Sequence, residues 1–211
     1  MQPSEMRAWV DIDLGALQRN AVAVVDRARA PLLPMIKADA YGLGAIPVAR
    51  VLEPLDPWGY GVATVREGLE LRAAGIARPI VIFTPLSIEE LSDVRAAELT
   101  PSLARAEDIA RWHADGGGAW HLAIDTGMSR AGIRWDEVDR LRKAIGQCPP
   151  EGAYTHFHSA ELNDGSRRAM AAEFSACNRR GRSGSIAIAS RKRVSCSSSE
   201  SSLSSAEWKC V

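Results

Sequence analysis

The chain has 211 residues, no formal net charge at pH 7, 46% hydrophobic residues and 25% charged residues. This length suits one main domain with a sizeable core, and no apolar run approaches the roughly 18 residues that a membrane span needs. Residues 1–7 carry charges of both signs and lack the basic-then-apolar layout of a secretion signal. The four cysteines form no CxxC pair, which argues against a metal or redox motif. We therefore expect a cytoplasmic protein with no membrane partner.

Short apolar runs alternate with longer amphipathic stretches from residue 8 to about residue 174. Seven runs are predicted to be strands: 9–13, 32–36, 58–62, 80–83, 99–102, 120–124 and 152–156. Four stretches are predicted to be helices that cover the sheet: 14–29, 65–74, 104–113 and 136–145, the last with Asp136 as its cap. This alternation predicts an α/β fold, an incomplete (β/α)8 TIM-type barrel of about six strand-helix units over residues 1–174.

The composition changes at residue 175. Residues 175–211 contain twelve serines, seven of the 26 basic residues and two of the 26 acidic ones, and no helical or strand period survives. Such a segment cannot bury enough apolar surface to offset its ordering entropy, so we expect disorder. Two origins stay open: a Ser/Arg arm that binds nucleic acid through its charge, or a shifted reading frame. Composition favours the second, so no nucleic-acid partner is expected.

Lys37 follows the predicted strand 32–36 and precedes Tyr41 and two glycines, Gly42 and Gly44. The carboxyl ends of barrel strands form the active-site face. A lysine there can form a Schiff base with an aldehyde cofactor, and the glycines let the backbone approach a ligand closely. The alternative is an ordinary turn with a solvated lysine. That reading loses weight because the next lysine along the chain is Lys143.

Two further strand ends carry chemistry-bearing side chains. Arg130 follows the predicted strand 120–124 within the segment Asp125-Thr-Gly-Met-Ser-Arg-Ala-Gly-Ile133, and His156 ends the predicted strand 152–156. Arginine stays charged and can bind the phenolic oxygen of a pyridoxal ring, whereas a surface arginine in a polar turn is the plain alternative. A buried, satisfied histidine is the usual fate of a residue such as His156. We predict that the three strand ends meet at one mouth.

With these motifs the sequence resembles the alanine racemase family of fold type III pyridoxal phosphate enzymes. The resemblance covers residues 8–161. It rests on Trp9-Val-Asp-Ile-Asp-Leu14, the Lys37 and Tyr41 loop, Gly61-Val-Ala with Glu67-Gly68, Leu71-Arg-Ala-Ala-Gly-Ile76, Asp125-Thr-Gly-Met with Arg130, and Thr155-His-Phe157. It implies Lys37 as the cofactor lysine and one of two catalytic bases. It also implies that Tyr41 contacts the cofactor phosphate, Arg130 contacts the ring oxygen and substrate, and His156 supports the pocket.

Three positions depart from the family pattern: Asp39 stands in place of the usual Asn, Leu43 in place of the usual His, and Ala123 where many members have a carbamylated lysine. The family's later phosphate-binding segments are not recognisable, nor is its β-rich C-terminal domain, which supplies an opposing tyrosine across a homodimer. The resemblance thus implies interconversion of L- and D-alanine for peptidoglycan precursors, with pyridoxal 5′-phosphate, impaired by truncation. The alternatives are a noncatalytic barrel that binds this cofactor, or a racemase of another small amino acid such as serine.

Overall fold

The computed structural model describes residues 10–146 and 148–157. In chain order the elements are α1 (Leu14–Ala28), α2 (Lys37–Gly42), α3 (Ala45–Leu52), the 3-10 helix η2 (Glu53–Leu55), β1 (Tyr60–Val62), α4 (Val65–Ala73), β2 (Ile80–Ile82), α5 (Glu90–Ala96), β3 (Thr100–Leu103), α6 (Ala106–Ala114), β4 (His121–Asp125), β5 (Ile133–Arg134), η3 (Val138–Leu141), α7 (Arg142–Ile145) and β6 (Gly152–Thr155). The predicted boundary at residue 174 and the segment 175–211 lie outside the described residues.

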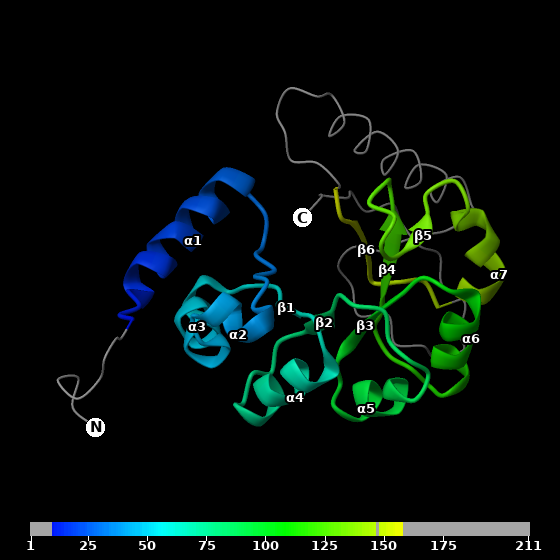
Figure 1. Ribbon diagram of the computed structural model, residues 1–211, viewed down its shortest axis with the longest axis horizontal. Coiled ribbons are helices and arrows are strands. Elements are labelled where there is room, and N and C mark those ends of the chain that lie inside the picture. Colours follow the sequence, from blue (N-terminus) through cyan, green and yellow to red (C-terminus); the bar gives the residue numbers. More distant parts are fainter. Residues whose placement is uncertain (1–9, 147, 158–211) are drawn as a thin grey trace, which may run out of the picture.

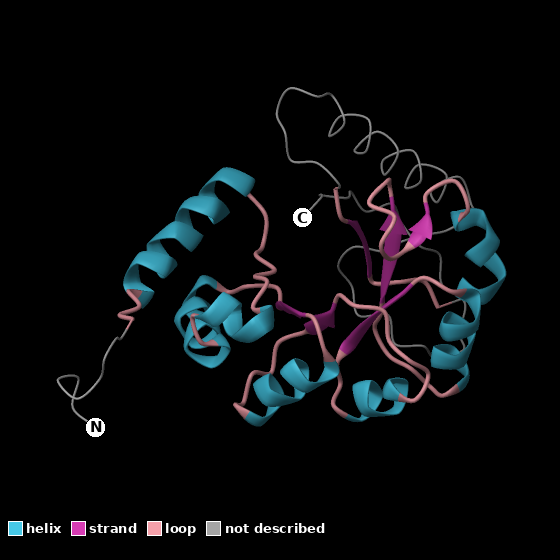
Figure 2. Cartoon of the chain, in the orientation of Figure 1, coloured by secondary structure: helices cyan, strands magenta, loops and turns pink. Residues whose placement is uncertain are grey.

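The strands form one parallel sheet in the order β1-β2-β3-β4, with both β5 and β6 paired to β4. Figure 1 shows α4, α5, α6 and α7 following one another along the outer side of the curved sheet, and Figure 2 shows the same division into helices and strands by colour. Parallel strands joined by helices are the repeating unit of an α/β barrel. The prediction of an α/β barrel fold is confirmed.

The register divides the strand residues between two faces of the sheet, because paired residues share a face and neighbours along a strand alternate. The outer face is apolar and packs with the helices, through Tyr60, Val62, Ile80, Ile82, Leu103, Leu122 and Ile124. The inner face is smaller and more polar, with Gly61, Val81, Thr100, Ser102, His121, Ala123, Gly152 and Tyr154. The hydrophobic core therefore lies between sheet and helices, and the polar groups of the strands face inward.

One ring contact demonstrates how strongly the sheet curves. The rings of Phe83, just after β2, and Tyr154, on β6, lie 4.6 Å apart, although β3 and β4 separate these strands in the sheet. The contact must therefore cross the inside of the curve. Gly61 lies in the same interior, where a side chain would clash, because a Cβ there would stand 2.3 Å from the Met35 sulfur.

Helix α1 differs from its prediction. The sequence predicts that it covers the sheet, yet none of its residues is buried, and it packs beside α3 at one end of the molecule (Figure 1). Leu14, Leu17 and Ala21 contact the core from its inner side. Val24, which falls on the same helical face by spacing, is 53% exposed. None of the helices in the described part of the chain is long and apolar enough to cross a membrane.

Two predicted strands are wrong, and a predicted cap is wrong as well. Residues 10–13 form no strand, because Asp13 accepts a hydrogen bond from the Ala16 amide and starts α1. Of the predicted strand 32–36, only Met35 forms a bridge, with Gly61. Asp136 does not cap a helix, because its carboxylate binds the Arg134 guanidinium.

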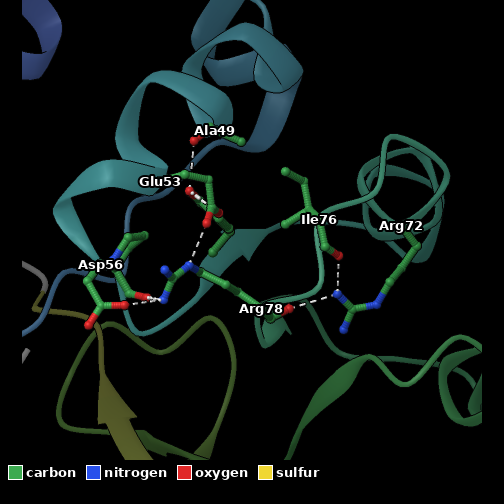
Figure 3. A network of polar contacts seen from close by, with 8 residues as sticks. Ala49, Glu53, Asp56, Arg72, Ile76 and Arg78 are labelled. Carbon is green, nitrogen blue, oxygen red and sulfur yellow. Dashed lines mark hydrogen bonds and ion pairs between the residues drawn. The ribbon is translucent and has the colours of Figure 1, made fainter.

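A network of polar contacts ties the loops at the amino ends of the strands together (Figure 3). The Arg78 guanidinium binds the carboxylates of Glu53 at 2.8 Å and Asp56 at 2.9 Å. The Tyr60 hydroxyl lies 2.9 Å from both the Glu53 carboxylate and the Ala49 carbonyl, either of which can accept its one proton. Burial, together with the Glu53 carboxylate, raises the pKa of Tyr60, so this phenol remains a neutral donor. The network fixes the end of the barrel opposite the candidate site.

Candidate functional site at the carboxyl ends of the strands

Lys37 is the first residue of α2 and lies two positions after the Met35 bridge, whereas the sequence predicts it at the end of a strand over residues 32–36. The backbone after Lys37 is unusual: Ala38, Asp39, Ala40 and Tyr41 all have left-handed helical dihedrals, with φ between 51° and 58°. Left-handed turns of residues other than glycine cost roughly 1–2 kcal/mol each. Such strain persists only where the surroundings over-determine it, and it gathers at functional sites.

Two carboxylates hold this left-handed turn. The Asp39 Oδ1 accepts the Ala45 amide at 2.6 Å, so the departure from asparagine preserves an acceptor that starts α3. The Glu67 Oε1, from α4, accepts the Ala38 amide at 2.8 Å. The turn is therefore fastened on one side to the helix that follows it and on the other to a neighbouring unit of the barrel.

The turn brings together the two residues predicted from its sequence. The Lys37 Nζ lies 5.8 Å from the centre of the Tyr41 ring, and Lys37 is half-buried while Tyr41 is 63% exposed. An amine over an aromatic face at this distance is a cation–π contact. The phenol hydroxyl stands at the surface of the mouth, where a ligand can reach it.

Arg130 lies in the loop between β4 and β5, and its side chain is exposed. Asp125 shapes the loop, because its Oδ1 accepts the amides of Gly127 at 2.8 Å and Ser129 at 3.1 Å. Gly132 has φ +103°, and a Cβ there would stand 2.9 Å from the Asp125 backbone nitrogen. Glycine at this point lets the loop fold back over β4 and carry Arg130 at the strand end.

His156 follows β6 immediately and is exposed. The residue before it, Thr155, shares a 2.7 Å hydrogen bond between hydroxyl groups with the buried Thr126, the first residue after β4. The Arg130 loop and the His156 strand end are thus joined at their bases. Arg130 and His156 follow the carboxyl ends of β4 and β6, and Lys37 follows the Met35 bridge to Gly61. That the three side chains meet at one mouth stays a prediction.

A cavity of about 600 Å³ opens at the same end of the sheet, over β2, β3, β4 and β6. Its inner wall includes Phe83, Ser102, Ala123 and Tyr154, and Ala131 and Gly132 close it from the Arg130 loop. Lys37, Tyr41, Arg130 and His156 are not among its lining residues. The volume is that of a small-molecule site, and Ala123 leaves room where a longer side chain would project inward.

Burial raises the pKa of the Tyr154 phenol, opposed by the nearby Ser102 hydroxyl and Arg130. Tyr154 therefore stays protonated at neutral pH and donates to the Phe83 carbonyl at 3.4 Å. No group of His, Cys, Asp and Glu side chains within residues 10–146 and 148–157 could hold a metal ion.

Glu67, Ser102 and Tyr154 lie at or beside the site, and the sequence patterns predict a role for none of them. A signal for Glu67 was present, since Thr64-Val-Arg-Glu67 has the spacing of a capping box, which α4 forms in full. Ser102 and Tyr154 face inward only because of the register of the sheet, and short apolar runs do not reveal register.

Residues 10–146 and 148–157 form part of an α/β barrel, with a lysine on a strained turn near the carboxyl ends of its strands. A family model described as "Alanine racemase, N-terminal domain" matches residues 12–210. The chain belongs to this family. The matched range runs through residues 175–210, so the domain boundary predicted from composition stays a prediction.

Curated relatives support the same family assignment. The alanine racemase of Deinococcus deserti is 37% identical over 166 residues, which is 76% of this chain and 46% of that protein. That of Carboxydothermus hydrogenoformans is 34% identical over 166 residues, which is 74% of this chain and 45% of that protein. The chain spans about half the length of these curated relatives.

Solved structures give the same answer. The crystal structure of alanine racemase from Bacillus anthracis with bound L-Ala-P has a TM-score of 0.76 at 25% identity, covering 85% of this chain and 49% of that one. The enzyme from a D-cycloserine-producing Streptomyces lavendulae has a TM-score of 0.73 at 29% identity, covering 84% of this chain and 50% of that one.

Proposed function

We propose that this chain is an amino-acid racemase that interconverts L- and D-alanine with pyridoxal 5′-phosphate bound covalently to Lys37. The observation that carries the proposal is the half-buried Lys37, two positions after the Met35 bridge and at the start of a turn of four left-handed residues held by Glu67. Family membership supports the reaction class, and two of the structural relatives are described with L-Ala-P and with cycloserine bound.

The residues at the mouth fit the cofactor by the chemistry of their donors. Lys37 supplies an amine for the aldehyde carbon, Tyr41 an exposed phenol for the phosphate, and Arg130 an exposed guanidinium for the phenolic oxygen. Gly42 leaves its side of the turn open, because a Cβ there would meet no atom within 4 Å. When bound, the cofactor serves as an electron sink that stabilises negative charge at the substrate α-carbon.

Each side chain then has a definite task. Lys37 Nζ holds the cofactor and, once free, moves a proton to or from the substrate α-carbon. Arg130 would orient the ring and the substrate carboxylate through its charge. For His156, whose side chain is exposed, the resemblance implies a supporting role outside direct contact with the cofactor. A racemase needs a second proton carrier on the face of the substrate opposite Lys37. The family resemblance implies that this group is a tyrosine from the C-terminal domain of the other subunit of a homodimer.

The expected location, oligomeric state and product use rest on the same family resemblance. The protein would act in the cytoplasm, as a homodimer when the family's second domain is present, and its D-alanine would enter peptidoglycan precursors. Alanine is the expected substrate because the matching family model and the curated relatives are alanine racemases, and serine is the competing one.

The test is a racemisation assay on purified chain supplied with pyridoxal 5′-phosphate, with L-alanine or L-serine as substrate and the D-product measured by chiral chromatography. We expect slow formation of D-alanine that Lys37→Ala abolishes. Turnover of L-serine alone would move the assignment to a serine racemase. Cofactor bound at Lys37 without any D-product would make the chain a noncatalytic cofactor-binding barrel.

A further inference from the structure

We infer that Glu67 is a positioning residue for Lys37: one oxygen of its carboxylate caps α4, and the other holds the turn that presents the lysine. The inference rests on the proposed function of Lys37. Glu67 lies on α4, in the strand-helix unit after the one that carries the lysine, and it is not among the residues that line the cavity.

The two carboxylate oxygens of Glu67 accept hydrogen bonds from different segments. Oε2 accepts the Ala63 amide at 2.7 Å and the Thr64 amide at 3.2 Å, while the Thr64 hydroxyl accepts the Glu67 amide. These contacts form a complete capping box for α4. Capping needs only this one oxygen. Oε1 turns away from the helix and accepts the Ala38 amide at 2.8 Å, across to the turn that begins at Lys37.

The hydrogen bond from the Ala38 amide to Glu67 lies at the start of the left-handed part of the turn. Ala38 is the first of the four left-handed residues and the immediate neighbour of Lys37. The remaining hydrogen bonds of the turn are local, such as Ala40 amide to Ile36 carbonyl and Gly44 amide to Asp39 carbonyl, both at 2.9 Å. Within the described chain, Glu67 provides the side-chain hydrogen bond that reaches residues 37–42 from another element.

A hydrogen bond to a carboxylate is stronger than one between neutral groups, and it fixes a direction. With Ala38 held, the backbone at Lys37 keeps one path after the Met35 bridge, so the amine is pre-organised for a carbonyl ligand. Without the contact, the strained residues can relax to right-handed or extended dihedrals. Lys37 would then sample several directions, and its reaction with an aldehyde would slow.

The chain permits a variant that separates the two tasks. Glu67→Gln keeps one acceptor oxygen and gains an NH2 group, and glutamine is accepted in a capping box. Keeping its oxygen at Ala63 and Thr64 preserves two contacts, so the NH2 group turns to the Ala38 amide, donor against donor. Thr64→Ala damages the cap and leaves the Ala38 contact intact. Glu70→Gln removes an exposed carboxylate of the same helix, which binds Arg66.

The experiment measures two quantities on the full chain and on each variant. One is the amide hydrogen exchange of Ala38 without cofactor. The other is the rate of adduct formation at Lys37 with pyridoxal 5′-phosphate, trapped by borohydride and quantified by peptide mass spectrometry. In Glu67→Gln we expect exchange at Ala38 at least tenfold faster and adduct formation at least tenfold slower. Thr64→Ala and Glu70→Gln should stay within twofold of the parent for both quantities.

The outcomes separate the inference from the proposed function. Adduct at Lys37 in the parent and an equal rate in Glu67→Gln would overturn the positioning role and leave the proposed function standing. A slower rate without faster exchange at Ala38 would also overturn it, because the effect would not pass through this hydrogen bond. No adduct at Lys37 in the parent would overturn both. If Glu67→Gln does not fold, Glu67→Asp shortens the reach to Ala38 and retains the charge, with the same expected results.

Discussion

The hydroxyl groups of Thr126 and Thr155 lie 2.7 Å apart and join the end of β4 to the end of β6. Thr126 is buried and begins the loop that carries Arg130, whereas Thr155 precedes His156. One hydrogen bond therefore links the loop that carries Arg130 to the end of the strand that precedes His156.

This bond predicts a coupling that a double-mutant cycle can measure. Thr126→Val and Thr155→Val should each lower the free energy of unfolding by about 1–2 kcal/mol, because each leaves a hydroxyl without its partner. The double variant should cost little more than either single one, giving a coupling of about 1 kcal/mol. Urea denaturation of the four proteins measures it. Strictly additive effects would show that the two hydroxyls do not interact.

The buried imidazole of His121 should make the fold less stable in acid. It is buried on the inner face, its ring lies 5.5 Å from that of Trp58, and burial lowers its pKa from 6.5 to about 4. Between these values the unfolded chain binds more protons than the folded one, so stability falls as pH falls from 6.5 toward 4. We expect a loss of about 2 kcal/mol between about pH 7.5 and about pH 5 from this group.

Urea denaturation of the parent and of His121→Phe at several pH values measures this effect. The variant keeps a ring beside Trp58 and removes the titrating group, so its stability should fall less in acid. Burial also lowers the pKa of His113, which remains in both proteins and cancels in the difference. Parallel pH profiles for the two proteins would contradict the assignment to His121.

Gly132 should tolerate no side chain. With φ +103° and the Asp125 backbone nitrogen 2.9 Å from the position of a Cβ, Gly132→Ala must shift the loop that carries Arg130. We expect a destabilisation of about 2 kcal/mol, from strain and displaced backbone together. Gly118→Ala is the matched control, because a Cβ at Gly118 meets no atom within 4 Å, and it should change stability by less than about 0.5 kcal/mol. Equal thermal midpoints for the two variants would refute the close approach.

Replacing Arg72 by lysine should lower the stability of the fold substantially. Its guanidinium donates to the carbonyls of Ile76, Arg78, Glu98 and Ala97 at 2.6, 2.7, 2.8 and 3.1 Å, and thus ties two helix-to-strand turns together. An ammonium group cannot reproduce this planar fork, so Arg72→Lys should cost about 2–3 kcal/mol. Arg66→Lys, at an exposed pair with Glu70, should cost less than about 0.5 kcal/mol. Chemical denaturation compares the two, and a small loss at both positions would count against the network.

The sheet could be predicted from the sequence because its strands are short apolar runs between turn residues. The predicted runs contain β1 and β2 in full and overlap all but one residue of β3 and β4. Helix α5 was not predicted, although Ser87 and Glu90 form the reciprocal contacts of a capping box before it, at 2.8 and 3.4 Å. Seven residues present too little period for the helix pattern to be recognised.

Part of the candidate site could likewise be predicted from the sequence, and part could not. The positions of Arg130 and His156 after β4 and β6 follow from the strand runs that the sequence predicts, whereas the run before Lys37 forms only the Met35 bridge. The left-handed turn does not follow from the sequence pattern, because its residues prefer other dihedrals and adopt these only in the company of Glu67, 29 positions away in the chain from Ala38. Residues 10–13 have the pattern of a strand, and alternation alone cannot distinguish an extended approach to a helix from a paired strand.

Attachment of pyridoxal 5′-phosphate to Lys37 is tested most directly by a map of the adduct. The chain has four lysines, at positions 37, 143, 192 and 209, so trapping with borohydride followed by peptide mass spectrometry can assign every adduct. We predict that, at cofactor equimolar with protein, the pyridoxyl group is found on Lys37 and is lost in Lys37→Arg. An adduct spread over the four lysines, or confined to the exposed Lys143, would contradict a cofactor site at Lys37.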